Sequence, residues 1–207
     1  MMGYIFTEQL FYGIETLGIL SFALSGVILA KQKDFDIVGV YIIAWVTAFG
    51  GGTIRDVILD IQPVYWISHS EYPLMLLGLV VLISLFNRIK IKESWLMIPD
   101  ALGMALFAIS TAKMAIELQH PPIIVAILAT IVASFGGVIR DSLCQETPMI
   151  FKKGSTIYAS LAFWGALLFV LLIDLALFTP FLSYFIAVIT VFVMRLLAIK
   201  YAWRWKI

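Results

Sequence analysis

Seven stretches of this 207-residue sequence are almost continuously apolar, and several of them reach about 20 residues. A helix needs roughly 20 apolar residues to cross the hydrocarbon core of a membrane. Hydrophobic residues make up 62% of the chain and charged residues 13%, a composition that excludes a water-soluble globular protein. The sequence therefore predicts an all-α polytopic membrane protein with seven transmembrane helices. The predicted spans are residues 10–30, 37–59, 73–87, 95–115, 122–143, 157–178 and 181–199.

The residues at the ends of these spans favour helix termini. Asp36 precedes the second span and can cap it, and Pro121 and Pro122 open the fifth. An outer-membrane barrel would show short segments of alternating hydrophobicity, whereas these runs are continuously apolar. Helices are therefore expected throughout.

The basic residues predict how the bundle is oriented. Eleven of the 14 Lys and Arg residues follow the first, third, fifth and seventh spans. By the positive-inside rule, the N-terminus is then outside and the C-terminus cytoplasmic. The eleven are Lys31, Lys33, Arg88, Lys90, Lys92, Lys152, Lys153, Arg195, Lys200, Arg204 and Lys206. The other three, Arg55, Lys113 and Arg140, fall inside predicted spans.

Several classes of function are excluded by composition and motif. A net charge of +1 leaves no basic surplus for nucleic acid. The single cysteine, Cys144, excludes an intramolecular disulfide, and no His/Cys cluster has metal-ligand spacing. Because no Ser/His/Asp set, HExxH helix or Walker-type loop is present, we expect neither an enzyme nor a cofactor.

Two parts of the chain repeat each other at a spacing of 85 residues. ETLGILSFALSG at 15–26 aligns with DALGMALFAIST at 100–111, and FGGGTIRD at 49–56 aligns with SFGGVIRD at 134–141. Over residues 15–63 against 100–148, 16 of 49 positions are identical without a gap. Each repeat holds three spans, an odd number, so the second copy must lie upside down relative to the first.

This pattern predicts one transmembrane domain over residues 1–207. It contains two inverted three-helix repeats at 10–87 and 95–178, a seventh helix at 181–199, and a basic, aromatic tail at 200–207. Inverted repeats with glycine-interrupted helices occur in transport proteins, where the permeating species lies near mid-membrane. The alternative is that duplication only made a stable bundle.

Glycines cluster at the matching place in both repeats. They are Gly50, Gly51 and Gly52 in the first repeat, and Gly136 and Gly137 in the second. Each disfavours a helix by about 1 kcal/mol relative to alanine, which favours a kink. A kink would turn carbonyl oxygens toward protein or a water-filled path, and such oxygens suit an alkali cation that sheds water. The alternative is close packing of helix backbones through small residues.

An Arg-Asp dipeptide follows each glycine cluster, and such charges are costly inside a membrane. The dipeptides are Arg55 with Asp56 and Arg140 with Asp141. Adjacent helical residues point about 100° apart, so we do not expect the two charges of a dipeptide to pair with each other. Similar depths in the membrane instead predict two ion pairs, Glu15 with Arg55 and Asp100 with Arg140. Both dipeptide aspartates would then be free to attract cations or to bind backbone amides at the kinks. Alternatively, the arginines reach the lipid headgroups, and the pairs only hold helices together.

Lys113 lies in the fourth span near its outer end. It is a candidate for a movable gate, because a cation at the mouth of a cation path repels permeant ions and senses the membrane field. Snorkelling to the headgroups is the alternative. His69 and His120 fall in outer loops without partner ligands, and we interpret them as ordinary polar loop residues.

With the paired GGGTIRD and GGVIRD motifs, two three-helix repeats and a seventh helix, the sequence resembles the prokaryotic branch of the trimeric intracellular cation (TRIC) channel family. This bacterial family has also been labelled a glycine transporter family. The resemblance covers about residues 10 to 199. It implies a homotrimer in which each protomer has its own pore, lined by the kinked second and fifth helices and passing potassium and sodium.

Carried over by position, the resemblance matches the kinks to the two glycine clusters, and Lys113 to basic fourth-helix residues implicated in gating of animal members. Phe135 stands where a third glycine of the second cluster would align. The chain also lacks the long loops and tail of animal relatives, which favours a bacterial plasma membrane over a reticulum.

We therefore expect a monovalent-cation channel in the inner membrane of a prokaryote. Its partners would be two further copies of the chain, membrane lipids, and the permeant potassium and sodium ions, with no other metal. One alternative is a secondary transporter of a small amino acid such as glycine, which half-helix ends could hold. Another is a structural scaffold.

Overall fold

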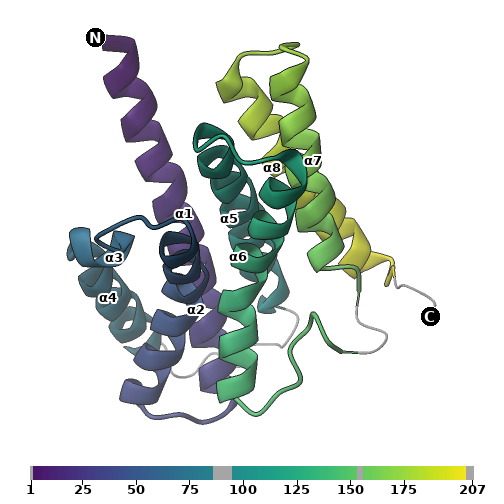
Figure 1. The fold of residues 1–207 in the computed structure, drawn as a ribbon. Helices are drawn as coiled ribbons and strands as arrows, with labels where there is room; N and C mark the ends of the chain where they lie inside the picture. The colour runs from purple at the N-terminus through teal and green to yellow at the C-terminus, as the bar shows by residue number, and fades with distance from the viewer. Residues whose placement is uncertain (1, 86–94, 153–155, 204–207) are drawn as a thin grey trace.

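A computed structural model of the chain describes residues 2–85, 95–152 and 156–203. Its regular elements in these ranges are all helices, and α3 is a single short turn between two longer ones (Figure 1). In chain order they are α1 (Met2–Gln32), α2 (Ile37–Ile58), α3 (Tyr65–Ser68), α4 (Glu71–Leu85), α5 (Met97–Glu117), α6 (Pro122–Leu143), α7 (Ala159–Asp174) and α8 (Pro180–Lys200).

A helix covers most of each predicted span, so the all-helical prediction is confirmed. Two differences stand out. Helix α1 begins at Met2 rather than near residue 10, and α3 was not predicted. Four helical segments in the described ranges are long and apolar enough to cross a membrane: Tyr12–Gln32, Ile37–Ile58, Pro122–Leu143 and Pro180–Lys200. Helices α4 and α7 are apolar but shorter.

The helix ends form for local chemical reasons. The Asp36 carboxylate accepts a hydrogen bond from the Gly39 amide at 2.7 Å, so it caps α2 as predicted. Pro121 and Pro122 start α6, where the missing amide hydrogens have no helical acceptor.

The ends of the helices also repeat at the 85-residue spacing. Helices α1 and α5 end at Gln32 and Glu117, and α2 and α6 end at Ile58 and Leu143. Each end is followed by a residue with positive φ, and these residues also lie 85 positions apart. The two pairs are Asp34 with Gln119, and Asp60 with Gln145.

The four helices α1, α2, α5 and α6 pack against one another at the centre. Helix α4 packs on α2, α7 packs on α6 and α5, and α8 packs on α5 and α7. Figure 1 shows that α1 and α5 run in opposite directions, as do α2 and α6. Matching helices of the two sequence repeats are therefore antiparallel.

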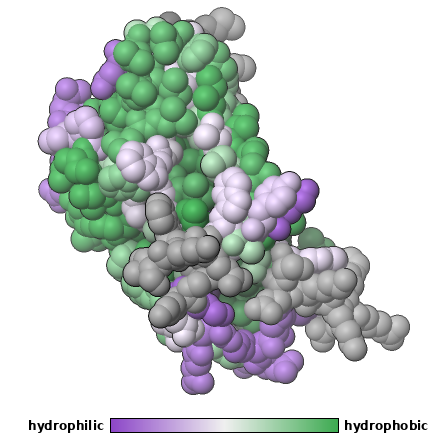
Figure 2. All heavy atoms as spheres, turned by 90° about the vertical axis from the view of Figure 1, so that its right-hand side faces the viewer, coloured by the Kyte–Doolittle hydropathy of each residue, from purple (hydrophilic) through white to green (hydrophobic). Residues whose placement is uncertain are grey.

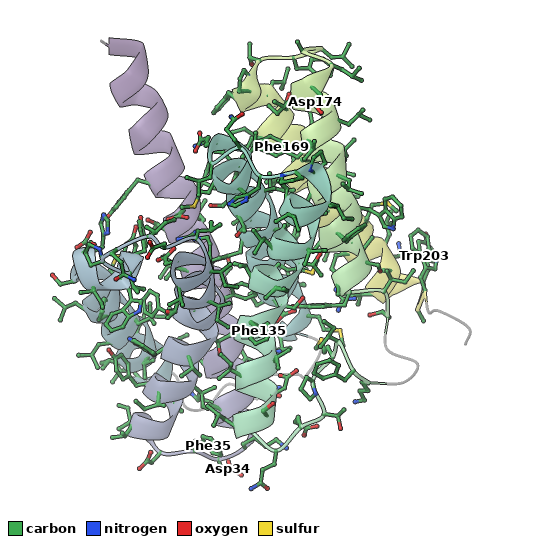
Figure 3. All side chains as sticks on the ribbon, viewed as in Figure 1. Asp34, Phe35, Phe135, Phe169, Asp174 and Trp203 are labelled. Atoms are coloured by element: carbon green, nitrogen blue, oxygen red, sulfur yellow. The ribbon has the colours of Figure 1, made fainter. Side chains whose placement is uncertain are left out.

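The surface divides into an apolar body and polar ends. In the view toward α7 and α8, hydrophobic side chains cover most of the face and hydrophilic ones gather at its lower end and along one edge (Figure 2). Asp34 lies at the lower end of the molecule and Asp174 at the upper end (Figure 3). At the lower end, Lys33 forms an ion pair with Glu146, which joins the α1–α2 and α6–α7 connections.

One cation that was expected beside a span end, Arg195, lies elsewhere, and several others fall outside the described ranges. Arg195 was counted as a cytoplasmic flanking residue, but it lies within α8 and is only 2% exposed. The carbonyl oxygens of Thr156 and Ile157 accept hydrogen bonds from its guanidinium. These bonds replace those to water, so the cation can lie in the interior. The predicted cations that lie outside the described residues are Arg88, Lys90, Lys92, Lys153, Arg204 and Lys206.

Candidate functional site

The first buried charge cluster joins three helices around Arg55 of α2. Arg55 is 2% exposed, and its Nη1 donates to Glu15 Oε1 of α1 at 2.8 Å. Its Nε donates to Asp56 Oδ1, also at 2.8 Å. Ser110 of α5 donates from its hydroxyl to the same Glu15 oxygen at 2.9 Å. We call these four residues the first cluster.

The second cluster is built in the same way around Arg140 of α6. Arg140 is 1% exposed, and its Nη1 donates to Asp100 Oδ1 of α5 at 2.7 Å. Its Nε donates to Asp141 Oδ1 at 2.8 Å. The same Nη1 also donates to the Ser25 hydroxyl of α1 at 2.9 Å. The structure thus contains both ion pairs that the sequence predicts, Glu15 with Arg55 and Asp100 with Arg140.

Every member of one cluster has its counterpart 85 residues away in the other. Ser25 corresponds to Ser110 in this register, and each serine completes the ion pair of the opposite repeat. Both serines lie in the FALS and FAIS segments of the repeat, yet their role went unnoticed in the sequence. A repeat alignment shows that two residues match, but it does not show that their side chains cross between the copies.

The expectation that neighbouring Arg and Asp residues would not pair is wrong. It considered only the 100° between adjacent side-chain directions, whereas an arginine has three methylene groups that let its guanidinium turn back. The fork of five N–H groups then lets Nε contact the next residue while Nη1 reaches another helix. Arg55 and Arg140 both use this geometry.

The two aspartates are therefore not free. Besides the arginine, Asp56 accepts at Oδ2 from the Tyr65 amide at 2.8 Å, and Asp141 accepts at Oδ2 from the Met149 amide at 3.3 Å. The Tyr65 amide begins α3, within the connection between α2 and α4, and the Met149 amide lies in the connection between α6 and α7. Neither belongs to a glycine cluster. The aspartates thus fasten these connections to the buried arginines.

The glycine clusters lie where α2 and α6 touch. A Cβ on Gly51 would come within 2.2 Å of the Val132 carbonyl oxygen, and one on Gly136 within 2.3 Å of the Thr47 carbonyl oxygen. Close packing through small residues therefore accounts for these two glycines. Both segments are assigned as continuous α-helix, and the kinks remain a prediction.

Gly50 also faces α6, because a Cβ there would come within 2.8 Å of the Ile139 side chain. Gly52 and Gly137 have different surroundings. A Cβ on Gly52 would meet only the Phe107 ring, at 3.5 Å. A Cβ on Gly137 would lie 3.6 to 3.8 Å from polar atoms of Arg140, Tyr158 and Asp100. Phe135 lies on α6, where Figure 3 labels it. It is 39% exposed, so this large side chain is not part of the buried core.

Two phenylalanines pack together between α1 and α5. The rings of Phe22 and Phe107 lie 5.3 Å apart, and these residues again match at 85 positions. Each ring fills space that a glycine of the opposite helix leaves: a Cβ on Gly103 would meet the Phe22 ring at 2.6 Å, and one on Gly18 the Phe107 ring at 3.0 Å. This apolar contact was missed in the sequence.

Two cavities reach the clusters from opposite ends of the bundle. The first cavity, of about 380 Å³, is lined by Glu15, Arg55 and Ser110 of the first cluster. The second, of about 450 Å³, is lined by Asp141 of the second cluster together with Lys33 and Glu146. The two cavities share no lining residue. Each therefore exposes a carboxylate of one cluster to the space beside it.

Lys113 also lines the first cavity. Its Nζ lies 2.7 Å from Glu117 Oε1, one turn further along α5. His69 lines the same cavity, with its ring stacked on Tyr65 at 4.3 Å, so it is less remote from the site than its loop position suggested. His120 follows the end of α5, where its amide donates to the Ala115 carbonyl. Across the described residues, no three His, Cys, Asp or Glu side chains could hold a metal ion.

Comparison with known proteins gives a consistent set of relatives. The family model described as "Glycine transporter" matches residues 12–88 and 97–174. The membrane protein YvgT of Bacillus subtilis is 37% identical over 158 residues, which is 75% of this chain and 77% of YvgT. The inner membrane protein YadS of Escherichia coli K12 is 34% identical over 77% of each chain.

Solved structures match over almost the whole chain. The trimeric intracellular cation channel orthologue from Rhodobacter sphaeroides superposes with a TM-score of 0.85 at 31% identity, covering 93% of this chain and 98% of the orthologue. A prokaryotic TRIC channel crystallised in 0.5 M KCl superposes with a TM-score of 0.86 at 30% identity, covering 94% and 98%.

Proposed function

Because this chain belongs to the prokaryotic TRIC channel family, whose model carries the description "Glycine transporter", we propose that it is a passive channel for potassium and sodium. The observation that carries the proposal is the pair of cavities at opposite ends of the bundle, each with a buried Arg-carboxylate cluster at its wall. Buried charges inside apolar helices are costly and commonly mark an ion pathway. The matched solved structures are those of cation channels, and we propose no catalytic activity.

The proposed architecture is one transmembrane domain of seven membrane-spanning helices. Two inverted three-helix repeats comprise α1, α2 and α4, and then α5, α6 and α7, and α8 is the added helix. Three observations support the inversion: the antiparallel course of matching helices, helix ends 85 residues apart, and two clusters with matching members. An inverted repeat puts equivalent chemistry at both mouths of a path.

The proposed path runs through one protomer, from the first cavity past the glycine-rich middle of α2 and α6 to the second cavity. A space of about 10 Å³, enough for one water molecule, lies beside Arg55, Gly52 and Phe107 and continues from the first cluster toward the glycines. Glu15 and Asp141 would draw cations to the two ends, while the arginines set the local field. Kinks at the glycine clusters would open carbonyl oxygens to the ion.

The oligomeric state and the membrane location that we propose are those of the family. We propose a homotrimer with a pore in each protomer, embedded in the lipids of a bacterial inner membrane. YadS is named an inner membrane protein, and the matched channel from Rhodobacter sphaeroides is named trimeric, which supports both points. The positive-inside rule places the first cavity outside and the second cavity on the cytoplasmic side. In this orientation, Lys113 and Glu117 face the outside.

Planar bilayer recording of the purified full-length protein tests the proposal. We expect discrete unitary currents in potassium chloride gradients that reverse at the potassium Nernst potential, and similar currents in sodium chloride. Gly78→Ala is the control variant, because its position on α4 is open within 4 Å. Saturable uptake of a small amino acid without unitary currents would reject the channel in favour of a transporter.

A further inference from the structure

Arg195 of α8 is a buried cation that the repeats do not account for. It lies in the helix beyond the second repeat, so no residue of the first repeat corresponds to it. Only 2% of Arg195 is exposed. In the part of the chain that the structure describes, no carboxylate lies within ion-pair distance of it, and its Nε has no hydrogen-bond acceptor. Burying a charge without an ion-pair partner is costly, so we ask which residues Arg195 contacts and what those contacts do.

The hydrogen bonds of Arg195 go to the start of α7. Its Nη1 donates to the Thr156 hydroxyl at 2.7 Å, to the Ile157 carbonyl at 2.7 Å and to the Thr156 carbonyl at 3.3 Å. The guanidinium carbon lies 4.7 Å from the centre of the Tyr158 ring, a cation–π contact. One side chain thus fixes three consecutive residues.

Tyr158 also lies close to the second cluster. Its hydroxyl lies 3.6 Å from the point that a Cβ would occupy on Gly137. The same point lies 3.6 Å from Arg140 Nη2 and 3.8 Å from Asp100 Oδ1. Tyr158 therefore lies between Arg195 on one side and the Asp100–Arg140 ion pair on the other.

Met149 forms a second connection. Arg195 Nη2 approaches the Met149 sulfur at 3.7 Å, while the Met149 amide donates to Asp141 Oδ2. Met149 and Asp141 both line the second cavity. Arg195 thus touches Met149, which donates to Asp141, and Tyr158, whose hydroxyl faces the same point beside Gly137 as the Asp100–Arg140 pair.

We propose that Arg195 is a positioning residue for cation passage at the second cavity, holding Met149 and Tyr158 so that Asp141 and the Asp100–Arg140 pair keep their places. The proposal rests on the channel function above and adds an asymmetry to it. The second cluster is braced by a cation of α8, outside the repeats, whereas α8 reaches the first cavity through the uncharged Tyr184. Changes at Arg195 should therefore alter one mouth of the path and leave the other unchanged.

Cysteine accessibility in the full-length protein, reconstituted in liposomes, tests this directly. Cys144, which is buried, is first replaced by alanine. Thr147→Cys reports on the second cavity and Met114→Cys on the first, because each residue lines that cavity. The probe is a charged methanethiosulfonate reagent, applied from both sides of the membrane.

The main variant is Thr156→Val, which keeps the shape of the side chain but removes the hydroxyl acceptor of Arg195. Arg195→Lys is the second variant, since it keeps the charge but loses the planar fork. Thr190→Val is the matched control on α8, because the exposed Thr190 hydroxyl donates to the Ile186 carbonyl one turn earlier in the same helix. All variants are checked for elution as the wild-type assembly.

We expect Thr156→Val and Arg195→Lys to raise the modification rate at residue 147 by at least about threefold and to leave residue 114 unchanged. Thr190→Val should change neither rate. An unchanged rate at residue 147 in both correctly assembled variants would overturn the proposal, as would an equal increase at both reporters. The measurement needs no current, so its failure differs from the absence of channels in bilayers.

Discussion

Gly51 of α2 and Gly136 of α6 lie on the two sides of one helix contact, each against a backbone carbonyl of the other helix. The carbonyls belong to Val132 and Thr47, one turn before the opposite glycine. The contact is reciprocal because the two glycines are equivalent positions of the repeat. A side chain at either position has no direction in which to move aside, since backbone atoms face it.

Alanine at these glycines should therefore destabilise the protein. We expect Gly51→Ala and Gly136→Ala each to lower the free energy of unfolding by about 1–3 kcal/mol, because the helices must separate to admit a Cβ. Thermal unfolding in detergent measures the change. Gly78→Ala is the control, and it should be neutral or slightly stabilising, because that site is open and alanine favours a helix. Equal effects at all three positions would argue against the contact.

The two ion pairs should differ in their contribution to stability. The side chains of Arg140 and Asp100 are each 1% exposed, whereas that of Glu15 is 17% exposed beside the first cavity. We expect Asp100→Asn to cost about 3–5 kcal/mol, the usual effect of removing one partner of a buried pair. Glu15→Gln should cost clearly less, because water reaches that carboxylate. Thermal unfolding of both variants decides this, and a larger loss for Glu15→Gln would contradict it.

Exchanging the charges of the first pair should not restore it. In Glu15→Arg combined with Arg55→Glu, the new glutamate would lie beside Asp56, which now accepts from Arg55 Nε. Like charges at this distance repel. We expect the double variant to have lower channel open probability and stability than wild type, and no higher stability than Glu15→Arg alone. Recovery to wild-type values would show that Asp56 has little influence on the pair.

Lys113 and Glu117 should affect cation currents in opposite directions. Both line the first cavity, and their charged atoms are 2.7 Å apart. We expect Lys113→Ala to raise open probability or flatten its voltage dependence, because a repelling charge leaves the mouth. Glu117→Gln makes the mouth one charge more positive and should lower the cation current. Single-channel recording of each variant measures these effects. Unchanged currents in Lys113→Ala would show that Lys113 does not act as a gate.

The Lys33–Glu146 ion pair should give a small pH-dependent stability. Lys33 lowers the pKa of Glu146 below its ordinary value of 4.5, by hydrogen bonding and by its charge. A lowered carboxylate pKa stabilises the fold above the ordinary value, and the effect is lost as pH falls through the folded value. We expect Glu146→Gln to reduce stability by up to about 1 kcal/mol at pH 7, and the difference to disappear as the pH falls below the lowered pKa of Glu146. Added salt at pH 7 should shrink the difference, and a salt-insensitive loss would contradict an exposed pair.

Much of the central bundle was predictable because the sequence encodes it twice. Helix α2 ends at Ile58 and α6 at Leu143, within a residue of the predicted spans. The ion pairs of Arg55 and Arg140 followed from the depth of each charge along its helix. The depth of a residue along a helix depends only on the regular rise per residue, so it can be calculated from the sequence once the helix ends are known.

The errors lie where long side chains or loop backbones decide the structure. Nothing in the order of residues indicates that Arg55 bends back to Asp56, or that the Tyr65 amide supplies the second hydrogen bond of that aspartate. The short helix α3 was missed because four residues give no periodic signal. Arg195 was misplaced because basic residues near a span end usually reach water, whereas here loop carbonyls accept its hydrogen bonds.

The crossing of Ser25 and Ser110 between the clusters bears on how such a protein could be divided or assembled. A fragment containing only one repeat would keep an arginine and its carboxylate partners but would lack the hydroxyl that meets them. Co-expressed fragments would have to insert in opposite orientations before either polar centre was complete. The covalent link between the halves therefore has a second effect. It ensures that one repeat of each orientation is always present in the same molecule.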